Sequence, residues 1–471
     1  MKKKIISLIL TSVCCVSILA GSPFATAADE NTTVQEKRQI LDMADAGRIA
    51  LKNNPSIKAV KERLSQAEAA IEQAKAAFYP SLDASGSVSM TDYSEASALP
   101  DIDEEYSAEL SATLVLFSGF SRKLALDLAA SANSSEIEAW NNARRLLLLS
   151  VAQSYTNVQL AIAAIETWQT DTLYYKKLLK DAEIKHKAGS GSLSDVLSFN
   201  VQVNAAESDL TDAQKNYRIA LAGFAAILGY DDLTLPEGTT LTSLGSDLYN
   251  KTSLPDMNAL IRLAESNRPD LKLYEHAITQ AEKTIGISQS GYYPTVSLYG
   301  TYNGRRNDDA GFNNDDFGST AAVKVSFNIF SGGLTKSKVA EARAKKREAR
   351  FNKADKETSV KEEVITAWYE LDNAIKQLDL QKASTALVKR NRDLVEAEYK
   401  AGKTTLVRLT EAQSNVIKTR NLYFQAAANL EFAEEKIKAY TGTNLDPFVK
   451  SNKMAKEKGP YTRFSLWPGL K

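Results

Sequence analysis

Four short motifs each occur twice in this chain, in the same order, and they limit the folds that it can adopt. The two members of each pair are 213 or 214 residues apart. The pairs are Asn54-Pro55 and Arg268-Pro269, Tyr79-Pro80 and Tyr293-Pro294, Phe117-Ser118-Gly119 and Phe330-Ser331-Gly332, and Lys187-Ala188-Gly189 and Lys400-Ala401-Gly402. Ordered motifs that keep one spacing indicate two copies of a single structural unit.

The repeat divides the mature chain into four segments. We predict a first copy over residues 28–230 and a second copy over residues 256–444. Residues 231–255 are rich in Gly, Thr, Ser and Pro, a composition that predicts a linker between the copies. Residues 445–471 form a tail outside the repeat.

The first 27 residues, 1–27, have the features of a secretory signal peptide. A basic start at residues 2–4 precedes an apolar run over residues 5–20, and Ala25-Thr26-Ala27 supplies the small residues of a cleavage site. A retained membrane anchor and a lipoprotein modified at Cys14 or Cys15 are less favoured alternatives. Because both cysteines of the chain lie in this segment, the secreted protein is predicted to fold without disulfides.

Each copy contains two stretches in which apolar or small residues alternate with polar ones. These stretches are residues 82–90 and 106–116 in the first copy, and residues 296–302 and 321–329 in the second. A period of two predicts strands with one apolar and one polar face, and most of the runs approach the length of a tilted membrane strand. The polar, acidic segments 91–105 and 303–318 are predicted to be exposed loops. A soluble hairpin packed on a core shows the same alternation, so the strands alone leave both interpretations open.

Very long helices are predicted beside these strands. Residues 120–188 and 334–401 contain neither Gly nor Pro, and each span of about 70 residues corresponds to a helix of about 100 Å. Typical globular helices run 8–20 residues, so a globular domain does not explain them. Returning helices are predicted at 193–222 and 403–441, shorter helices at 57–78 and 271–291, and helical segments from near Met43 and Met257 up to the X-Pro motifs.

Charge and hydropathy narrow the classes of function further. Without the three signal lysines the chain has 55 basic and 58 acidic residues, which argues against a phosphate-binding surface for nucleic acid. No apolar stretch of the mature chain reaches the roughly 20 residues of a membrane helix, so any membrane crossing must use strands. Four strands cannot close a barrel, and open strand edges are not tolerated in hydrocarbon, so the strand interpretation requires an oligomer.

The duplicated X-Pro, Tyr-Pro, Phe-Ser-Gly and Ala-Gly motifs resemble those of the TolC family of outer-membrane factors, over about residues 41–444. The resemblance implies a mainly α protein with membrane β structure. Three subunits with four strands each would form a 12-stranded outer-membrane β-barrel, continued by a long periplasmic α-helical barrel. It further implies an exit duct in the outer membrane of a Gram-negative bacterium, serving type I secretion or drug efflux. The implied partners are a periplasmic membrane-fusion adaptor and, through it, an inner-membrane ABC or RND pump.

The same resemblance implies two sites. The turns between the paired long helices would dock the adaptor, and the matching residues are Ala188, Gly189, Gly191, Ser192, Leu193, Ser194, Asp195, Ala401, Gly402, Thr404, Thr405 and Leu406. The entrance constriction would involve Arg408 and Glu411, with Tyr399 in the closure contacts. The best-studied branch of the family has acidic residues at both constriction positions, so Arg408 departs from that pattern. An ordinary surface pair between Arg408 and Glu411 is the alternative.

Nothing in the sequence predicts an enzyme, a cofactor or a metal site. The two histidines, His186 and His276, lie about 90 residues apart and have no ligand spacing around them. The alternative from another class is a periplasmic coiled-coil adaptor or structural stalk. That alternative shares the secretion signal and the long helices but does not require two alternating hairpins at one fixed offset.

Overall fold

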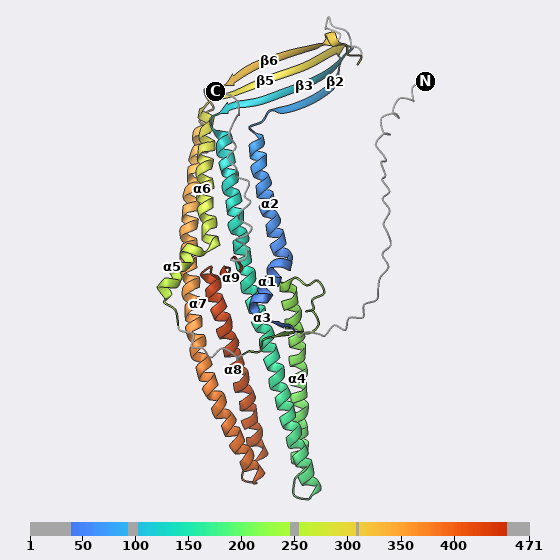
Figure 1. Cartoon of the computed structure of the whole chain (residues 1–471), viewed down its shortest axis with the longest axis vertical. Helices are drawn as coiled ribbons and strands as arrows, with labels where there is room; N and C mark the ends of the chain where they lie inside the picture. The colour runs from blue at the N-terminus through green and yellow to red at the C-terminus, as the bar shows by residue number, and fades with distance from the viewer. Residues whose placement is uncertain (1–38, 93–101, 245–253, 308–309, 450–471) are drawn as a thin grey trace, which may run out of the picture.

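The computed structural model describes residues 39–92, 102–244, 254–307 and 310–449. The chain is strongly elongated, with a small sheet at one end and helices that run away from it along the long axis (Figure 1). The predicted signal peptide and, apart from residues 445–449, the predicted tail lie outside the described residues.

The order of elements is the same in the two halves of the chain. The first half contains α1 (Met43–Asn53), α2 (Pro55–Ala76), β2 (Ser81–Asp92), β3 (Ile102–Ser118), α3 (Ser121–Lys187) and α4 (Leu193–Leu228). The second half contains α5 (Met257–Asn267), α6 (Pro269–Gln289), η1 (Ser290–Tyr292), β5 (Thr295–Asn307), η2 (Asn314–Asp316), β6 (Phe317–Ser326), α7 (Leu334–Lys400) and α8 (Leu406–Tyr440). Strands β1 (Gln39–Leu41) and β4 (Thr239–Leu241) and helix α9 (Asp446–Val449) complete the fold. The long helices α3 and α7 have 67 residues each, as the absence of Gly and Pro predicts.

Several predicted boundaries were wrong. Helix α4 continues through Gly223 to Leu228 instead of ending at residue 222, since the following Phe224 and Leu228 are buried and favour the helix. Strand β6 ends at Ser326, so the predicted strand residues 327–329 lie beyond it. The strands on either side of both predicted loops are longer than the alternation indicated.

The four long strands form one antiparallel sheet in the order β2-β3-β5-β6. The register places the predicted apolar positions of neighbouring strands opposite each other, for example Ala84 with Leu110 and Leu298 with Val323. Apolar side chains on this face are exposed in the chain, including Leu82, Val88 and Val323, which are each at least 62% accessible. Strands β2 and β6 are the two edges of the sheet, and each has a neighbour within the chain on one side only.

The helices beneath the sheet form a single layer in the order α2-α3-α6-α7, with α3 packed on both α2 and α6 (Figure 1). Farther from the sheet, α4 pairs with α3 and α8 pairs with α7. Buried apolar clusters fix these pairs, one around Tyr155 and Phe224 and another around Val364 and Leu430. Like the sheet, the layer therefore has two lateral edges, on α2 and on α7.

One helix of the described part, α3, contains a window long and apolar enough to cross a membrane by length and composition. The prediction that no mature segment reaches this length therefore needs correction at α3. Half of the window is buried inside the fold, as in the core helix of a packed bundle.

Candidate functional site

The turn between α3 and α4 closes the first helix pair at the end farthest from the sheet (Figure 1). Gly189 has φ +74°, its amide donates to the carbonyl of His186, and the amide of Ser190 donates to the carbonyl of Lys185. These two bonds form a Schellman cap, which requires a left-handed residue at the position of Gly189. Ser192 then caps the start of α4, since its hydroxyl accepts from the amide of Ser194 at 3.1 Å.

The turn between α7 and α8 has the same construction. Gly402 has φ +70°, its amide donates to the carbonyl of Tyr399, and the amide of Lys403 donates to the carbonyl of Glu398. Thr405 caps the start of α8 with its hydroxyl. In both turns an added Cβ on the glycine would meet nothing within 4 Å, so the backbone conformation, not crowding, requires glycine.

Tyr399 joins the two helix pairs next to these turns. Its hydroxyl donates to Oδ2 of Asp195 at 3.2 Å, which connects α7 to α4. Its ring lies edge-on to Phe199 with centroids 6.1 Å apart, and the Nζ of Lys185 lies 5.8 Å from its centroid. Burial and the negative charge of Asp195 raise the pKa of Tyr399 to about 12, so the phenol remains a neutral donor at physiological pH.

A second set of polar contacts joins the helix pairs farther from the tip, about one helical turn from Tyr399 at Glu396 and about two turns from it at Arg392. Nε2 of Gln413 on α8 donates to Oδ1 of Asp171 on α3 at 2.6 Å, and Nη1 of Arg392 on α7 donates to Oε1 of Gln413 at 2.8 Å. Beside them, the hydroxyl of Tyr174 on α3 donates to Glu396 on α7 at 3.2 Å. Asp171 and Gln413 are both buried, so the contact between α3 and α8 is shielded from water.

Burial makes the carboxyl group of Asp171 a weaker acid than an ordinary aspartate. Burial raises the pKa of Asp171 to about 6, although the hydrogen bond from Gln413 acts to lower that pKa. The carboxylate of Asp209 on α4 raises this pKa further, and the guanidinium of Arg392 lowers it. Asp171 therefore changes charge near pH 6, within the range of pH found outside cells.

The structure brings together only part of the predicted site. Tyr399 and Asp195 are in contact, whereas Arg408 and Glu411 are exposed on the face of α8 opposite the buried Leu409. In the described part of the chain neither Arg408 nor Glu411 forms an ion pair, so the alternative of a surface pair between the two is not observed.

Sequence reasoning did not identify the second set of contacts. Its central members, Asp171 and Gln413, are single polar residues at core-facing positions of long helices. Asp171 lies on the stripe of buried residues that includes Thr167, Tyr175 and Leu178. A polar residue that interrupts an apolar helical stripe was the available signal.

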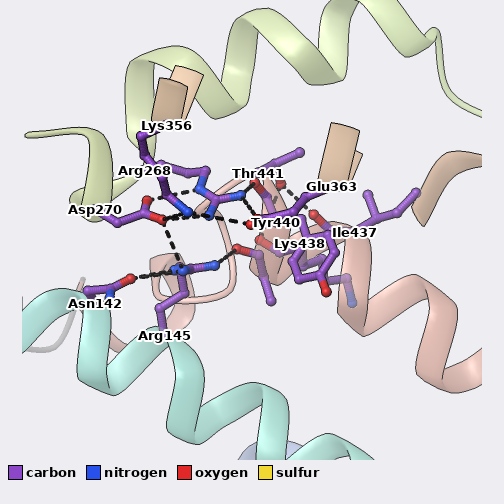
Figure 2. A network of polar contacts seen from close by, with 11 residues as sticks. Asn142, Arg145, Arg268, Asp270, Lys356, Glu363, Ile437, Lys438, Tyr440 and Thr441 are labelled. Carbon is purple, nitrogen blue, oxygen red and sulfur yellow. Dashed lines mark hydrogen bonds and ion pairs between the residues drawn. The ribbon is translucent and has the colours of Figure 1, made fainter. Parts of the chain in front are cut away.

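A buried ionic network fixes the other end of the helix pairs, where α6 begins and α8 ends (Figure 2). Arg268, 1% accessible, donates from Nε and Nη2 to the two carboxylate oxygens of Asp270, and from Nη1 to Glu363 on α7. Lys356 on α7 adds an ion pair to Asp270 at 3.2 Å, and Arg145 on α3 lies 3.7 Å from the same oxygen. The network thus joins α3, α6 and α7 around a single carboxylate.

The network also holds the end of α8. Nη1 of Arg145 donates to the carbonyl of Ala439 at 2.9 Å, and Nη1 of Arg268 reaches the carbonyl of Tyr440 at 3.4 Å. The corresponding residue of the first half, Asn54, donates to the carbonyl of Ile227 at 2.8 Å. Both residues before the repeated prolines therefore cap the returning helix, and only the second carries a charge.

Opposing effects set the ionisation of Asp270. Burial favours the neutral acid, but the hydrogen bonds and charge of Arg268, with Arg145 and Lys356, hold the pKa of Asp270 at about 2. A depressed pKa means that its contribution to stability is present above the ordinary carboxyl pKa and is lost as the pH falls toward 2.

Among the described residues, no group of three or more His, Cys, Asp and Glu side chains is arranged to hold a metal ion. Nδ1 of His186 lies 3.1 Å from the carbonyl oxygen of Gly191, within the first turn. This histidine therefore has a structural partner in the α3–α4 connection.

Comparison with known proteins identifies related sequences. The model of the outer membrane efflux protein family matches residues 47–230 and 260–443. The cation efflux system protein CusC of Escherichia coli K12 is 24% identical over 397 residues, which cover 83% of this chain and 84% of that protein. Outer membrane protein TolC of the same strain is 23% identical over 350 residues, covering 72% of this chain and 69% of that protein.

A solved structure of CusC has a similar fold. It matches with a TM-score of 0.73 at 20% identity, covering 85% of this chain and 92% of that chain. The VceC outer membrane protein of Vibrio cholerae matches with a TM-score of 0.69 at 17% identity, covering 85% and 96%. At these identities the likeness concerns the fold alone.

Proposed function

Since the chain belongs to the outer membrane efflux protein family, we propose that it is the outer-membrane exit duct of a tripartite efflux or type I secretion system. It acts in the outer membrane of a Gram-negative bacterium, where it exports substrates, and it is a channel and not an enzyme. The family match over both halves of the chain is the observation that carries this function, and it disfavours the adaptor or stalk alternative.

The assembly that suits this function is a homotrimer. A four-stranded sheet with exposed apolar side chains on one face has two open edges, β2 and β6, which hydrocarbon does not tolerate. The helical layer has matching lateral edges on α2 and α7. Three copies joined at these edges form a 12-stranded barrel continued by a 12-helix tunnel. The channel then contacts outer-membrane lipid through its barrel.

The two halves of the chain serve as two structural repeats of this tunnel. The repeats comprise residues 28–230 and 256–444, with residues 231–255 as the linker, residues 1–27 as the signal peptide and residues 445–471 as the tail. The support is the identical order of elements and the match of the family model to residues 47–230 and 260–443.

The tips of the helix pairs dock the periplasmic adaptor, which connects the duct to an inner-membrane ABC or RND pump. The docking residues are those of the two turns, Ala188, Gly189, Gly191, Ser192, Leu193, Ser194 and Asp195, and Ala401, Gly402, Thr404, Thr405 and Leu406. These residues are at the end of the chain farthest from the sheet, and most of them are exposed.

The entrance is held closed by contacts between the two helix pairs. Tyr399 with Asp195 forms the outer latch, and Asp171 with Gln413 and Arg392 forms an inner lock. Opening requires α7 and α8 to move away from α3 and α4, which breaks both sets of contacts. Adaptor docking beside Asp195 would favour that movement by binding the open tip more tightly.

Arg408 and Glu411 line the constriction, where three copies of each would surround the axis. Replacing Arg408 by Asp changes the ring from balanced to strongly negative, and a negative ring favours cations. We expect R408D to shift the reversal potential measured in a tenfold KCl gradient toward the potassium equilibrium potential. R262D on helix α5, where the side chain is 71% exposed, is the matched control and leaves the potential unchanged. An unchanged potential in R408D would remove Arg408 from the constriction.

The inner lock makes closure depend on pH. The raised pKa of Asp171 means that its contribution to the closed arrangement is present at low pH and is lost as the pH rises through about 6. We therefore expect dye release from proteoliposomes to increase several-fold between pH 5 and pH 7.5. D171N, which stays neutral, should hold the release at its low value throughout.

D209N is the matched control for this profile, because it removes an exposed carboxylate that faces Asp171 from α4. It should keep the pH dependence and move its midpoint slightly lower. A D171N channel with the wild-type profile would show that another group senses the pH.

The mass of the purified, detergent-solubilised particle tests the assembly, and an adaptor pull-down tests docking. Native mass spectrometry should give three chains, and a stable monomer would contradict the trimer.

Substituting Gly189 and Gly402 by Val, which disfavours φ near +70°, should weaken adaptor capture.

A further inference from the structure

Exposed aromatic side chains surround the junction between the sheet and the helices. They are Phe78, Tyr79, Phe120, Tyr292, Tyr293 and Phe330, and each is at least 42% accessible. Rings of Phe117 and Phe120 lie edge-on at 5.4 Å, and those of Phe120 and Tyr293 at 6.4 Å. Exposed aromatic residues at the end of membrane strands mark the interface between hydrocarbon and headgroups. We call this set the aromatic belt.

Two lysines occupy the same position immediately beyond the aromatic belt. Lys123 and Lys336 are the third residues of α3 and α7, and they are 213 residues apart, the spacing of the repeat. Both side chains are exposed, and within the described residues neither forms an ion pair or a hydrogen bond. At 1.5 Å per residue they lie within about one helical turn of the belt.

Arg122, next to Lys123, shows how a cation with a structural role is held beside the aromatic belt. Arg122 donates to the carbonyls of Ala77 at 3.1 Å and Leu116 at 2.9 Å, and it stacks on Phe78. Its charge is thus used to join α2, β3 and α3. Lys123 and Lys336 have no such partners, so their charge is available to a ligand.

In the proposed tube, both lysines are placed on the outer side of the helical layer. Each lies 32 residues before an aromatic residue of its own helix, Tyr155 in α3 and Trp368 in α7. Tyr155 donates to the carbonyl of Leu41, and Trp368 donates to that of Pro255, so both contact the segments that flank the layer. Because 32 residues make about nine turns, two residues at this spacing lie close to the same face of a supercoiled helix. In a closed tube these bulky segments fit only outside, which places the lysines outside too.

We propose that Lys123 and Lys336 bind the phosphate headgroups of anionic phospholipid in the periplasmic leaflet. The inference rests on the proposed trimeric channel, in which the two positions produce a ring of six cations just below the aromatic belt. The carboxylate of Asp127, four residues after Lys123, does not neutralise the charge of that lysine, because it is paired with Lys283 at 3.2 Å. Each lysine close to an anionic lipid surface strengthens binding by about fivefold.

The probe is phosphatidylglycerol mixed equally with phosphatidylcholine in nanodiscs that contain the full-length channel. Lipid retained by the purified protein is quantified by native mass spectrometry at low and high salt. We expect the wild type to retain phosphatidylglycerol at least fivefold over phosphatidylcholine at low salt, and K123Q/K336Q to lose this preference. The matched control is K187Q/K403Q, which removes two exposed lysines at the far end of the helices and should retain the preference.

Conductance of K123Q/K336Q, recorded in planar bilayers from the same purified protein, distinguishes failure of the lipid site from failure of the channel. Wild-type conductance with lost lipid preference supports the lipid site on a functioning channel. Equal lipid retention by the wild type and K123Q/K336Q, with conductance intact, overturns the lipid site and leaves the channel standing. Absence of conductance from the wild type would overturn the proposed function itself.

Discussion

Replacing Arg268 by methionine should lower the free energy of unfolding by about 3 kcal/mol, because it leaves Asp270 and Glu363 without their main cation in a buried site. Methionine has a similar length and fills the volume, so the effect reports the charge and not a cavity. Lys356 and Arg145 remain within 3.7 Å of Asp270 and keep the loss from being larger. The variant also frees the end of α8, since Arg268 reaches the carbonyl of Tyr440.

Guanidinium unfolding of the detergent-solubilised protein, followed by far-UV circular dichroism, measures this change. The matched control is K361M, which breaks an ion pair with Glu265 whose side chains are 50% and 41% exposed. That pair should contribute less than about 1 kcal/mol. Equal effects of R268M and K361M would show that burial of the network contributes nothing particular to stability.

Replacing Tyr399 by phenylalanine should increase leakage through the resting channel at least tenfold. The change removes the hydroxyl that donates to Asp195 and keeps the ring on Phe199. A hydrogen bond to a charged acceptor contributes about 1.5 kcal/mol or more, which corresponds to roughly a factor of ten in the open-to-closed ratio for each subunit. If the subunits open together, the factors multiply.

Dye release from proteoliposomes at pH 5, where the inner lock still contributes to closure, measures the leakage. Y369F on the same helix is the control, because the hydroxyl of Tyr369 has no hydrogen-bond partner in the described part of the chain and its ring is 59% exposed. Combining Y399F with Q413L, which removes the inner lock, should leak more than either change alone. Wild-type leakage in the double variant would rule out both contacts as closure devices.

The sequence predicted the long elements well because their signals are strong and local. The stretches without Gly or Pro coincide with α3 and α7 to within a residue at each end. The alternation of strand residues also predicted which side chains share a face, and the register confirms it except after Val115, where a register shift pairs Val296 with Phe117 instead of Leu116. Gly189 and Gly402 were predicted as turn residues, and their positive φ values supply the reason.

Short and long-range features were missed because periodicity does not reveal them. Strand β1 pairs in parallel with β4, and each has three residues drawn from segments about 200 positions apart. The ionic network depends on Arg268 meeting side chains of α7, and the sequence showed only that Arg replaces Asn before a repeated proline. The inner lock depends on Asp171 and Gln413 meeting across 242 positions.

Single-channel recording of the purified, detergent-solubilised protein in planar bilayers is the decisive test of a trimeric exit duct. We expect discrete, long-lived conductance steps from a particle with the mass of three chains, with larger steps after Y399F. A water-soluble species that never inserts and never conducts would show that the chain is not an exit duct.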